Sequence, residues 1–250
     1  MQRPAFKRII YSSGSPHGIL RNQVDKTNRT NQADQADHAG PADCVQTAIS
    51  GLRDDNLTGG KEERNAAMFY EMTIAGLKRQ LPLCKITDDL YIGAFIMFSD
   101  VEITKASAEQ LLAKAPEFDV IITAESKGIP LAYEMARQAG TDDYIVARKG
   151  PKLYMQNVIT TEVDSITTDH IQTLCLGQTE IDKMKGKRIL IVDDVISTGE
   201  SLKSLEVLVN QVGGNIVGKM AVLAEGEAAD RDDIIFLEKL PVFNADGSVK

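Results

Sequence analysis

The alternation of short apolar runs with amphipathic runs between Phe118 and Ala224 constrains the fold more than any other feature of the chain. The apolar runs are DVIIT (119–123), YIVAR (144–148), RILIVDDV (188–195) and IVGKMAVLA (216–224). Residues 129–140 and 200–214 lie between them, have apolar side chains at helical spacing and end at glycines. Strands that alternate with helices predict an α/β fold, with a central parallel sheet flanked by crossover helices. We expect the functional loops at the carboxyl ends of the strands.

Composition limits the classes of partner that the chain can have. The 250 residues are 43% hydrophobic, which is ample for a core, and carry a net charge of −8. This acidic balance argues against broad binding to nucleic acids or anionic membranes, so any anion site has to be built locally. No apolar run approaches the roughly 18 residues of a membrane helix, and the amino-terminal sequence lacks the apolar region of a signal peptide. We therefore expect a cytoplasmic protein with no membrane or nucleic-acid partner.

The three cysteines, Cys44, Cys84 and Cys175, are odd in number and lie far apart without C-x-x-C spacing. This pattern indicates neither a disulfide framework nor a zinc site. We expect reduced thiols and no dedicated cluster of metal ligands.

Both ends of the chain differ from the alternating middle. Residues 22–43 have Val24 as their only large aliphatic side chain, so they cannot bury enough surface to offset the entropy of ordering. We expect residues 1–60 to be a largely disordered N-terminal extension. Residues 61–80 place apolar side chains at mixed helical spacings, which favours a helix that leads into the core. Residues 226–250 form a C-terminal extension to which the sequence assigns no role.

The segment RILIVDDVISTGESL, residues 188–202, carries the clearest chemistry. A buried strand runs into Asp193 and Asp194, and a short polar loop then leads into a helix near Glu200. The unpaired N–H groups of a helix N-terminus favour an anion, and Gly199 lets the backbone approach it closely. Two carboxylates just upstream suit the vicinal hydroxyls of a ribose. The alternative is an ordinary capped helix, which needs one polar residue where this stretch has six.

A hydrophobic strand, two acids and a Thr-Gly loop resemble the phosphoribosyl pyrophosphate (PRPP) motif of the type I phosphoribosyltransferases. The segment contains neither the G-x-x-x-x-G-K of a Walker A loop nor the G-x-G-x-x-G of a dinucleotide fingerprint. The resemblance implies that Asp193 and Asp194 hold the ribose hydroxyls. It also implies a site for the 5′-phosphate of PRPP, made by Ser197, Thr198, Gly199, Glu200 and Ser201. Glu200 and Ser201 stand where the family often has Gly-Thr.

Two further segments resemble the adenine phosphoribosyltransferases and follow the same order along the chain. Glu125-Ser126-Lys127-Gly128 is similar to the family's Glu-Ser-Arg-Gly, with Lys127 in place of arginine. Residues 147–153, ARKGPKL, are similar to its Arg-Lys-x-x-Lys-Leu run. The resemblance implies a pyrophosphate site made by Glu125, Ser126, Lys127, Gly128, Arg148, Lys149 and Lys152. Read alone, the first segment is a polar turn and the second an exposed basic turn.

Two residues are implied for the base. Residues 154–168 are similar to the family's flexible loop and hairpin, and Glu162 aligns with a glutamate that assists proton transfer at the purine. A solvated strand residue is the alternative for Glu162. Residues 94–101 resemble the family's Leu-Phe-Arg-Asp-Ile, so that Phe98 would stack on the base, while Ser99 stands in place of the arginine.

The resemblance covers residues 81–223 and implies a type I phosphoribosyltransferase fold, with a small base-binding hood. We place this domain at residues 61–225. The implied reaction transfers the phosphoribosyl group of PRPP to a purine, adenine first, and releases pyrophosphate in purine salvage. Mg²⁺ would be bound mainly through PRPP, and a homodimer is implied. Two alternatives remain open: a non-catalytic PRPP-sensing regulator of purine metabolism, and an interaction protein whose working part is residues 22–43.

Overall fold

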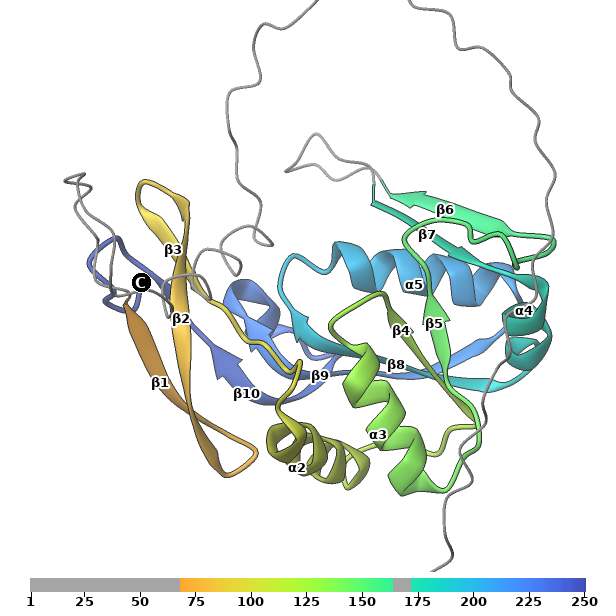
Figure 1. Cartoon of the computed structure of the whole chain (residues 1–250), viewed down its shortest axis with the longest axis horizontal. Coiled ribbons are helices and arrows are strands. Elements are labelled where there is room, and N and C mark those ends of the chain that lie inside the picture. The colour runs from red at the N-terminus through yellow and green to blue at the C-terminus, as the bar shows by residue number, and fades with distance from the viewer. Residues whose placement is uncertain (1–67, 164–171) are drawn as a thin grey trace, which may run out of the picture. The chain divides into compact units, whose positions relative to one another are not determined.

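The computed structural model describes residues 68–163 and 172–250. Its centre is a five-stranded parallel sheet with the order β10-β9-β8-β4-β5 (Figure 1). The strands are β4 (Val120–Ala124), β5 (Ile145–Ala147), β8 (Arg188–Ile196), β9 (Asn215–Glu225) and β10 (Ile235–Leu240). The helices α3 (Ile129–Ala139) and α5 (Glu200–Gln211) connect neighbouring strands of this sheet. The α/β class with a parallel sheet and flanking helices is confirmed.

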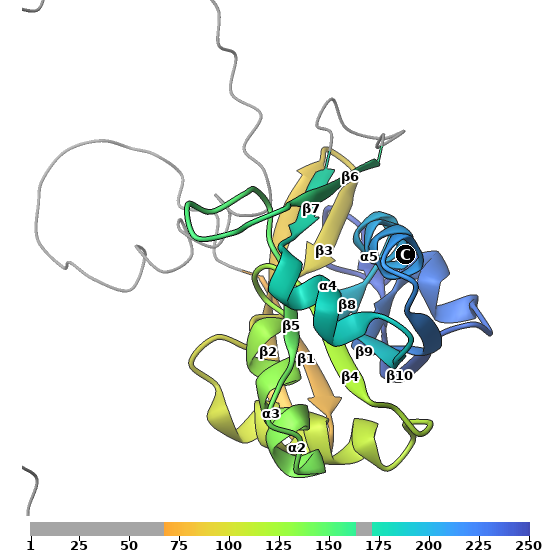
Figure 2. The ribbon, with the colours of Figure 1, turned by 90° about the vertical axis from the view of Figure 1, so that its right-hand side faces the viewer.

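Helices cover both faces of the sheet, with α3 and α2 (Val101–Leu112) on one side and α5 on the other (Figures 1 and 2). Alternate side chains of β8 enter the two cores because successive residues of a strand point to opposite faces. Ile189 and Ile191 pack with the core that includes Leu205 of α5, and Leu190 and Val192 pack with the core that includes α2 and α3. This two-sided burial explains why RILIV reads as a continuous apolar run.

A second, antiparallel sheet has the order β1-β2-β3-β11 and is called the hood sheet below. It contains β1 (Phe69–Ile74), β2 (Leu77–Thr87), β3 (Leu90–Gly93) and β11 (Val242–Phe243). The helix expected over residues 61–80 is therefore wrong wherever the structure describes that segment. Ala75 and Gly76 both have positive φ, of 49° and 81°, which is the geometry of a tight hairpin turn. The alternation of exposed Glu71 and buried Met72 is a strand period.

The C-terminal residues belong to both sheets. Strand β10 pairs in parallel with β9, and β11 pairs antiparallel with β3. Leu240 and Phe243 are almost completely buried. The residues that the sequence suggested as an extension after position 225 thus include an edge strand of the parallel sheet and a strand of the hood sheet. Their pattern is short and partly charged, which hides it from a search for apolar runs.

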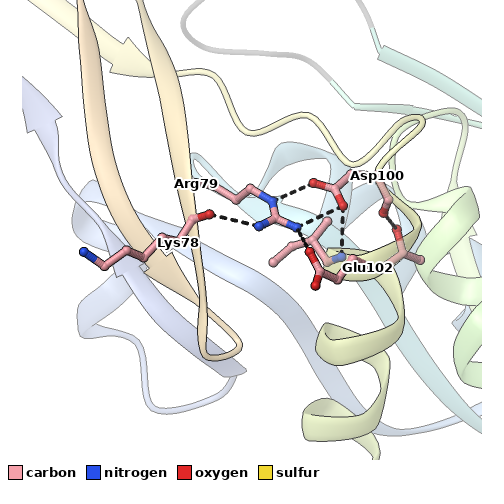
Figure 3. Close-up of polar contacts among 6 residues, drawn as sticks. Lys78, Arg79, Asp100 and Glu102 are labelled. Atoms are coloured by element: carbon pink, nitrogen blue, oxygen red, sulfur yellow. Dashed lines mark hydrogen bonds and ion pairs between the residues drawn. The ribbon is translucent and has the colours of Figure 1, made fainter.

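An ion-pair cluster links the hood sheet to α2 (Figure 3). Arg79 of β2 donates from Nε and Nη2 to the two Asp100 carboxylate oxygens at 2.7 and 3.1 Å, and from Nη2 to Glu102 at 2.8 Å. Asp100 also accepts the Ile103 N–H and thereby caps α2. These contacts raise the pKa of Arg79 and lower that of Asp100, mainly through the hydrogen bond between the two side chains. A bidentate pair of this kind fixes orientation as well as distance.

Two smaller elements complete the described residues. Strands β6 (Ile159–Val163) and β7 (Gln172–Leu176) form an antiparallel hairpin, and α4 (Gln178–Met184) follows it. The disorder expected for residues 1–60, and the part of the implied flexible loop at 164–168, lie outside the described residues. Within residues 68–163 and 172–250, no helix is long and apolar enough to span a membrane.

Candidate active site at the carboxyl ends of β4, β8 and β9

The loop between β8 and α5 has the form that the sequence predicts. Gly199 adopts a left-handed conformation, with φ 81° and ψ 8°, immediately before the first turn of α5. A residue with a Cβ is strained there, so the glycine is required by the turn. Ser197 and Thr198 are exposed, while Glu200 and Ser201 are half-buried. The loop thus presents the N-terminus of a twelve-residue helix beside the end of β8.

Asp193 and Asp194 lie near the carboxyl end of β8, which ends at Ile196, and interact with each other. Asp193 Oδ1 accepts the backbone N–H of Asp194 at 2.9 Å. Burial, together with the adjacent Asp194 carboxylate, raises the pKa of Asp193 well above its ordinary value. Asp194 is only 4% exposed. A pair of carboxylates this close holds a charge that a cation or hydroxyl donors would stabilise.

Lys127 comes from the loop after β4 and faces this pair. Its Nζ lies 3.2 Å from Asp194 Oδ2, and the Lys127 side chain is 52% exposed. Although the ammonium is close, Oδ2 accepts no well-aligned hydrogen bond from any described residue. Lys127 therefore balances the charge of Asp194 without saturating its acceptor capacity.

Gly128 brings the loop after β4 into contact with β8. A Cβ built on Gly128 would lie 2.2 Å from Thr123 Oγ1 and 3.0 Å from Asp193 Oδ1. No side chain fits in that space, because both neighbours belong to buried or half-buried strand ends. Steric crowding thus explains why glycine stands at this position of the predicted pyrophosphate loop. The same loop includes a cis peptide between Glu125 and Ser126.

Glu125 contacts two residues of the basic segment 148–152. It accepts the Lys149 backbone N–H at 3.0 Å and forms an ion pair with Arg148 at 3.3 Å. The Lys149 N–H lowers the pKa of Glu125, and the charges of Arg148, Lys152 and Lys149 lower it further. Arg148 also exchanges backbone hydrogen bonds with Cys175 of β7, at 3.0 and 2.8 Å. The structure therefore brings together the two segments that the sequence assigned to pyrophosphate.

Buried polar atoms without a hydrogen bond concentrate in this region. Among the described residues they are Ser107 Oγ, Arg148 Nε and Asp194 Oδ2. Two of the three belong to the candidate site. Because an unsatisfied buried polar group costs about 1–3 kcal/mol, its presence at a site is an argument for a ligand that completes it.

The two residues assigned to the base stand apart from this network. Phe98 lies in the connection between β3 and α2, and its side chain is 46% exposed. The nearby Phe95 and Met97 side chains of the same connection are buried. Ser99 has a positive φ of 68°. Glu162 lies in β6 opposite Thr173, and its side chain is outside the described residues. Their roles in base binding and proton transfer stay predictions.

Glu225 is a candidate site residue that the sequence did not single out. It is the last residue of β9, one strand over from Asp193 and Asp194. Burial raises its pKa to about 7, and the nearby Lys127 ammonium opposes that rise. The rule that functional groups gather at the carboxyl ends of parallel strands would have singled it out, because it directly follows the apolar run 216–224.

The described residues contain no group of three or more His, Cys, Asp or Glu side chains that could hold a metal ion. The site nonetheless contains the oxygen ligands that Mg²⁺ prefers, because Asp194 Oδ2 is buried without a hydrogen bond beside Asp193. These two carboxylates fit a magnesium ion that takes its remaining ligands from a phosphorylated substrate.

Curated proteins with similar sequences include two kinds of phosphoribosyltransferase and a transcriptional repressor. The chain is 32% identical over 141 residues to an adenine phosphoribosyltransferase of Petrotoga mobilis, covering 52% of this chain and 72% of that protein. It is 29% identical to an orotate phosphoribosyltransferase of Caldanaerobacter subterraneus, covering 58% of this chain and 63% of that protein. It is 29% identical to a purine biosynthesis transcriptional repressor of Bacillus subtilis, covering 51% of this chain and 45% of the repressor.

A solved adenine phosphoribosyltransferase of Leishmania donovani shares the fold. Its TM-score is 0.51 at 18% identity, and the match covers 68% of this chain and 76% of that structure. The model of the phosphoribosyl transferase domain family matches residues 100–247, which include the β8–α5 loop, the loop after β4 and β10. The chain therefore belongs to the phosphoribosyl transferase domain family, with the type I fold that its parallel sheet displays.

Proposed function

We propose that the protein is a purine phosphoribosyltransferase that transfers the phosphoribosyl group of PRPP to adenine and releases pyrophosphate. The observation that carries this proposal is that the loops after β8 and β4 meet at one site. Asp193 and Asp194 at the end of β8 adjoin both the helix N-terminus after Gly199 and the Lys127 loop after β4. These groups match, in order, the ribose hydroxyls, the 5′-phosphate and the pyrophosphate of PRPP.

Catalysis in this site would come from charge placement. Cleavage of the bond to pyrophosphate develops positive charge on the ribose and negative charge on the leaving group, so cations fixed near the leaving group favour the transition state. Lys127 and Arg148 are held there by Asp194 and Glu125, with Lys149 and Lys152 in the same electrostatic neighbourhood. When bound through PRPP, Mg²⁺ would add positive charge to the leaving group.

The base would be held by residues outside this group of cations. Phe98 supplies an exposed aromatic face before α2, and Glu162 supplies a carboxylate in the hairpin β6–β7. The proposal assigns stacking to Phe98 and proton transfer at the purine to Glu162. Adenine is favoured over orotate because the match to the adenine enzyme covers more of that protein at higher identity.

The test is a set of parallel assays with purified protein, PRPP and Mg²⁺. Adenine, hypoxanthine, guanine, xanthine and orotate are supplied separately, and nucleotide formation is followed by chromatography. We expect turnover with adenine to exceed that with every other base. Turnover with orotate alone would overturn the choice of a purine, and binding of PRPP without any turnover would overturn the enzymatic activity.

A second candidate function is a PRPP-sensing regulator, and the similarity to the purine biosynthesis repressor favours it. Such a protein needs the PRPP site and not the base chemistry. PRPP binding measured by calorimetry, without nucleotide formation from any of the five bases, is the outcome that supports this candidate. We also propose a homodimeric cytoplasmic protein, for which sedimentation of the purified chain near twice 27.3 kDa is the expected result.

A further inference from the structure

An arginine from the C-terminal part of the chain lies against the predicted phosphate loop. Arg231 follows the short helix η1 (Gly226–Asp230), between β9 and β10. A Cβ built on Gly199 would lie 2.8 Å from Arg231 Nη1, and among the described residues beyond the adjoining backbone no other atom lies within 4 Å of it. The guanidinium thus occupies the space beside the glycine that begins α5. Along the sequence, the whole of α5 and β9 lies between Gly199 and Arg231.

A carboxylate holds the guanidinium in this position. Arg231 donates from Nε and from Nη2 to the two Asp233 oxygens, both at 2.8 Å. Lys219 of β9 contacts the same carboxylate and is itself 2.9 Å from Glu206 of α5. The Arg231 hydrogen bond, followed by that of Lys219, lowers the pKa of Asp233 far below its ordinary value. The Arg231–Asp233 ion pair, called the clamp, therefore keeps its charged carboxylate at neutral pH.

The clamp leaves one donor group of Arg231 available. The two hydrogen bonds to Asp233 use Nε and Nη2, and within the described part of the chain no hydrogen bond from Nη1 is present. Nη1 is also the atom nearest to Gly199. A guanidinium with one edge fixed and its remaining N–H groups aimed at a helix N-terminus is suited to an anion bound there, because charge-assisted hydrogen bonds are shorter and stronger than neutral ones.

The charge balance of the loop supports the same conclusion. Residues 197–201, Ser-Thr-Gly-Glu-Ser, contain no cationic side chain and add the carboxylate of Glu200. The cations assigned to pyrophosphate, Lys127 and those of the basic segment 148–152, belong to the loops after β4 and β5. A phosphate dianion at the loop would otherwise depend on backbone N–H groups and hydroxyls, beside a carboxylate that disfavours it.

We propose that Arg231 binds the 5′-phosphate of the sugar phosphate, through Nη1, together with the N-terminus of α5. This inference rests on the proposed PRPP site and adds a residue from outside its sequence motif. The contact also gives a second reason why glycine stands at position 199. Besides allowing the positive φ, the absence of a side chain leaves room for the guanidinium beside the loop.

Ribose 5-phosphate and inorganic pyrophosphate separate the two ends of the site, so both are titrated into the full-length protein by calorimetry. Arg231→Gln should weaken ribose 5-phosphate binding by about tenfold and leave pyrophosphate within about twofold, as expected for one charge-assisted contact. Arg188→Gln is the matched control. Arg188 also pairs with two carboxylates, Glu117 and Asp119, but stands at the opposite end of β8. The control should bind both ligands like the wild type.

Two more measurements distinguish a phosphate contact from a brace for the loop. Arg231→Lys keeps the charge and should recover part of the lost affinity. In addition, ribose 5-phosphate affinity should fall less steeply with salt in Arg231→Gln than in the wild type, because one fewer charge is screened. If Arg231→Gln does not fold, the affinities of Arg231→Lys decide: weaker binding of ribose 5-phosphate with unchanged binding of pyrophosphate supports the inference, and wild-type affinity for both ligands overturns it.

The outcomes keep this inference separate from the proposed enzymatic activity. Wild-type binding of ribose 5-phosphate that depends on Arg231, with no turnover of any base, supports the inference and overturns the activity. A folded Arg231→Gln variant that binds ribose 5-phosphate within about twofold of the wild type, with the same salt dependence, overturns the inference even if the enzyme is active. Failure of the wild type to bind ribose 5-phosphate overturns it as well.

Discussion

The two ends of the candidate site are built in different ways. At the phosphate end, the loop 197–201 relies on a helix N-terminus and on Arg231, which Asp233 clamps from the side. At the pyrophosphate end, the cations are paired with the site's own carboxylates, Lys127 with Asp194 and Arg148 with Glu125. The phosphate end is thus organised before a ligand arrives.

On the proposed assignment, the pyrophosphate end would exchange partners when substrate binds. Lys127 and Arg148 would turn part of their donor capacity from protein carboxylates to the ligand, while Asp194 would gain hydroxyl or metal partners. Exchanging one charged partner for another costs little net energy, so that ligand release is not penalised by very tight binding. We therefore expect that substitutions can change the affinity for the sugar phosphate and the release of pyrophosphate separately.

The largest expected effect comes from Gly128→Ala, which disturbs both ends through the contact of Gly128 with Asp193. The new Cβ would lie 2.2 Å from Thr123 Oγ1. We expect a destabilisation of about 1–3 kcal/mol, the usual cost of overpacking, and loss of PRPP binding. Thermal unfolding and calorimetry measure the two effects. Gly150→Ala, which has open space around its Cβ, should leave the unfolding temperature unchanged. Equal unfolding temperatures and equal PRPP binding in the two variants would refute the close approach of the Gly128 loop to β8.

Glu162→Gln should affect neither end and still slow the reaction. If Glu162 assists proton transfer at the purine, kcat should fall by about a hundredfold or more, the range of general acid–base catalysis being about 10² to 10⁴. The Kd for PRPP should remain that of the wild type. A fall in kcat of less than about threefold would mark Glu162 as a solvated hairpin residue, because exposed positions away from special features cost little.

Lys127→Gln sharpens the comparison between the ends. Its Nζ is 3.2 Å from Asp194, and removal of the ammonium should weaken pyrophosphate binding by about tenfold. Ribose 5-phosphate should bind within about twofold of the wild type. Lys85→Gln, in the hood sheet, removes a lysine that pairs with Asp88 and is the charge-matched control. Equal weakening of both ligands by Lys127→Gln would contradict a division of the site into two ends.

The smallest expected effect is a change in the pH dependence of stability in Glu225→Gln. Burial raises the pKa of Glu225 from 4.5 to about 7, so between these values the folded state binds more protons than the unfolded state. Stability therefore falls as the pH rises through this window. Unfolding temperatures at pH 5 and pH 8 should differ less in Glu225→Gln than in the wild type. The exposed Glu227→Gln should retain the wild-type difference, and an unchanged difference in Glu225→Gln would count against its burial.

Four strands of the parallel sheet, β4, β5, β8 and β9, were predictable because they are largely buried on both faces. Such burial leaves a continuous apolar run that sequence alone displays, and β4, β5, β8 and β9 were all found in this way. The hood sheet was missed for the converse reason. Strand β1 alternates exposed and buried residues over only six positions, β2 is exposed or half-buried along most of its length, and their turn, Ala75-Gly76, is weaker than an Asn-Gly signal.

The site shows the same division. Residues inside contiguous motifs, such as Lys127, Gly128, Asp193 and Gly199, were predictable from local order, and the structure gives each a geometric reason. Arg231 was not predictable, because its distance from Gly199 is set by the path of α5, β9 and η1 and not by any spacing in the sequence. Partner exchange at Asp194 is also a tertiary property, since Lys127 comes from a different strand end.

We propose that Asp193 and Asp194, beside the loop 197–201, bind PRPP. Calorimetric titration with PRPP and Mg²⁺ compares the wild type with the double variant Asp193→Asn/Asp194→Asn. The matched control is Asp142→Asn combined with Asp143→Asn, which changes an exposed adjacent pair of aspartates. All three proteins should fold, because removing two crowded carboxylates at a strand end relieves charge repulsion.

We expect the wild type and the control to bind PRPP alike, and the Asp193/Asp194 variant to bind at least about a hundredfold more weakly, since hydrogen bonds to two charged groups are lost. A folded Asp193/Asp194 variant that binds PRPP with wild-type affinity would contradict the account.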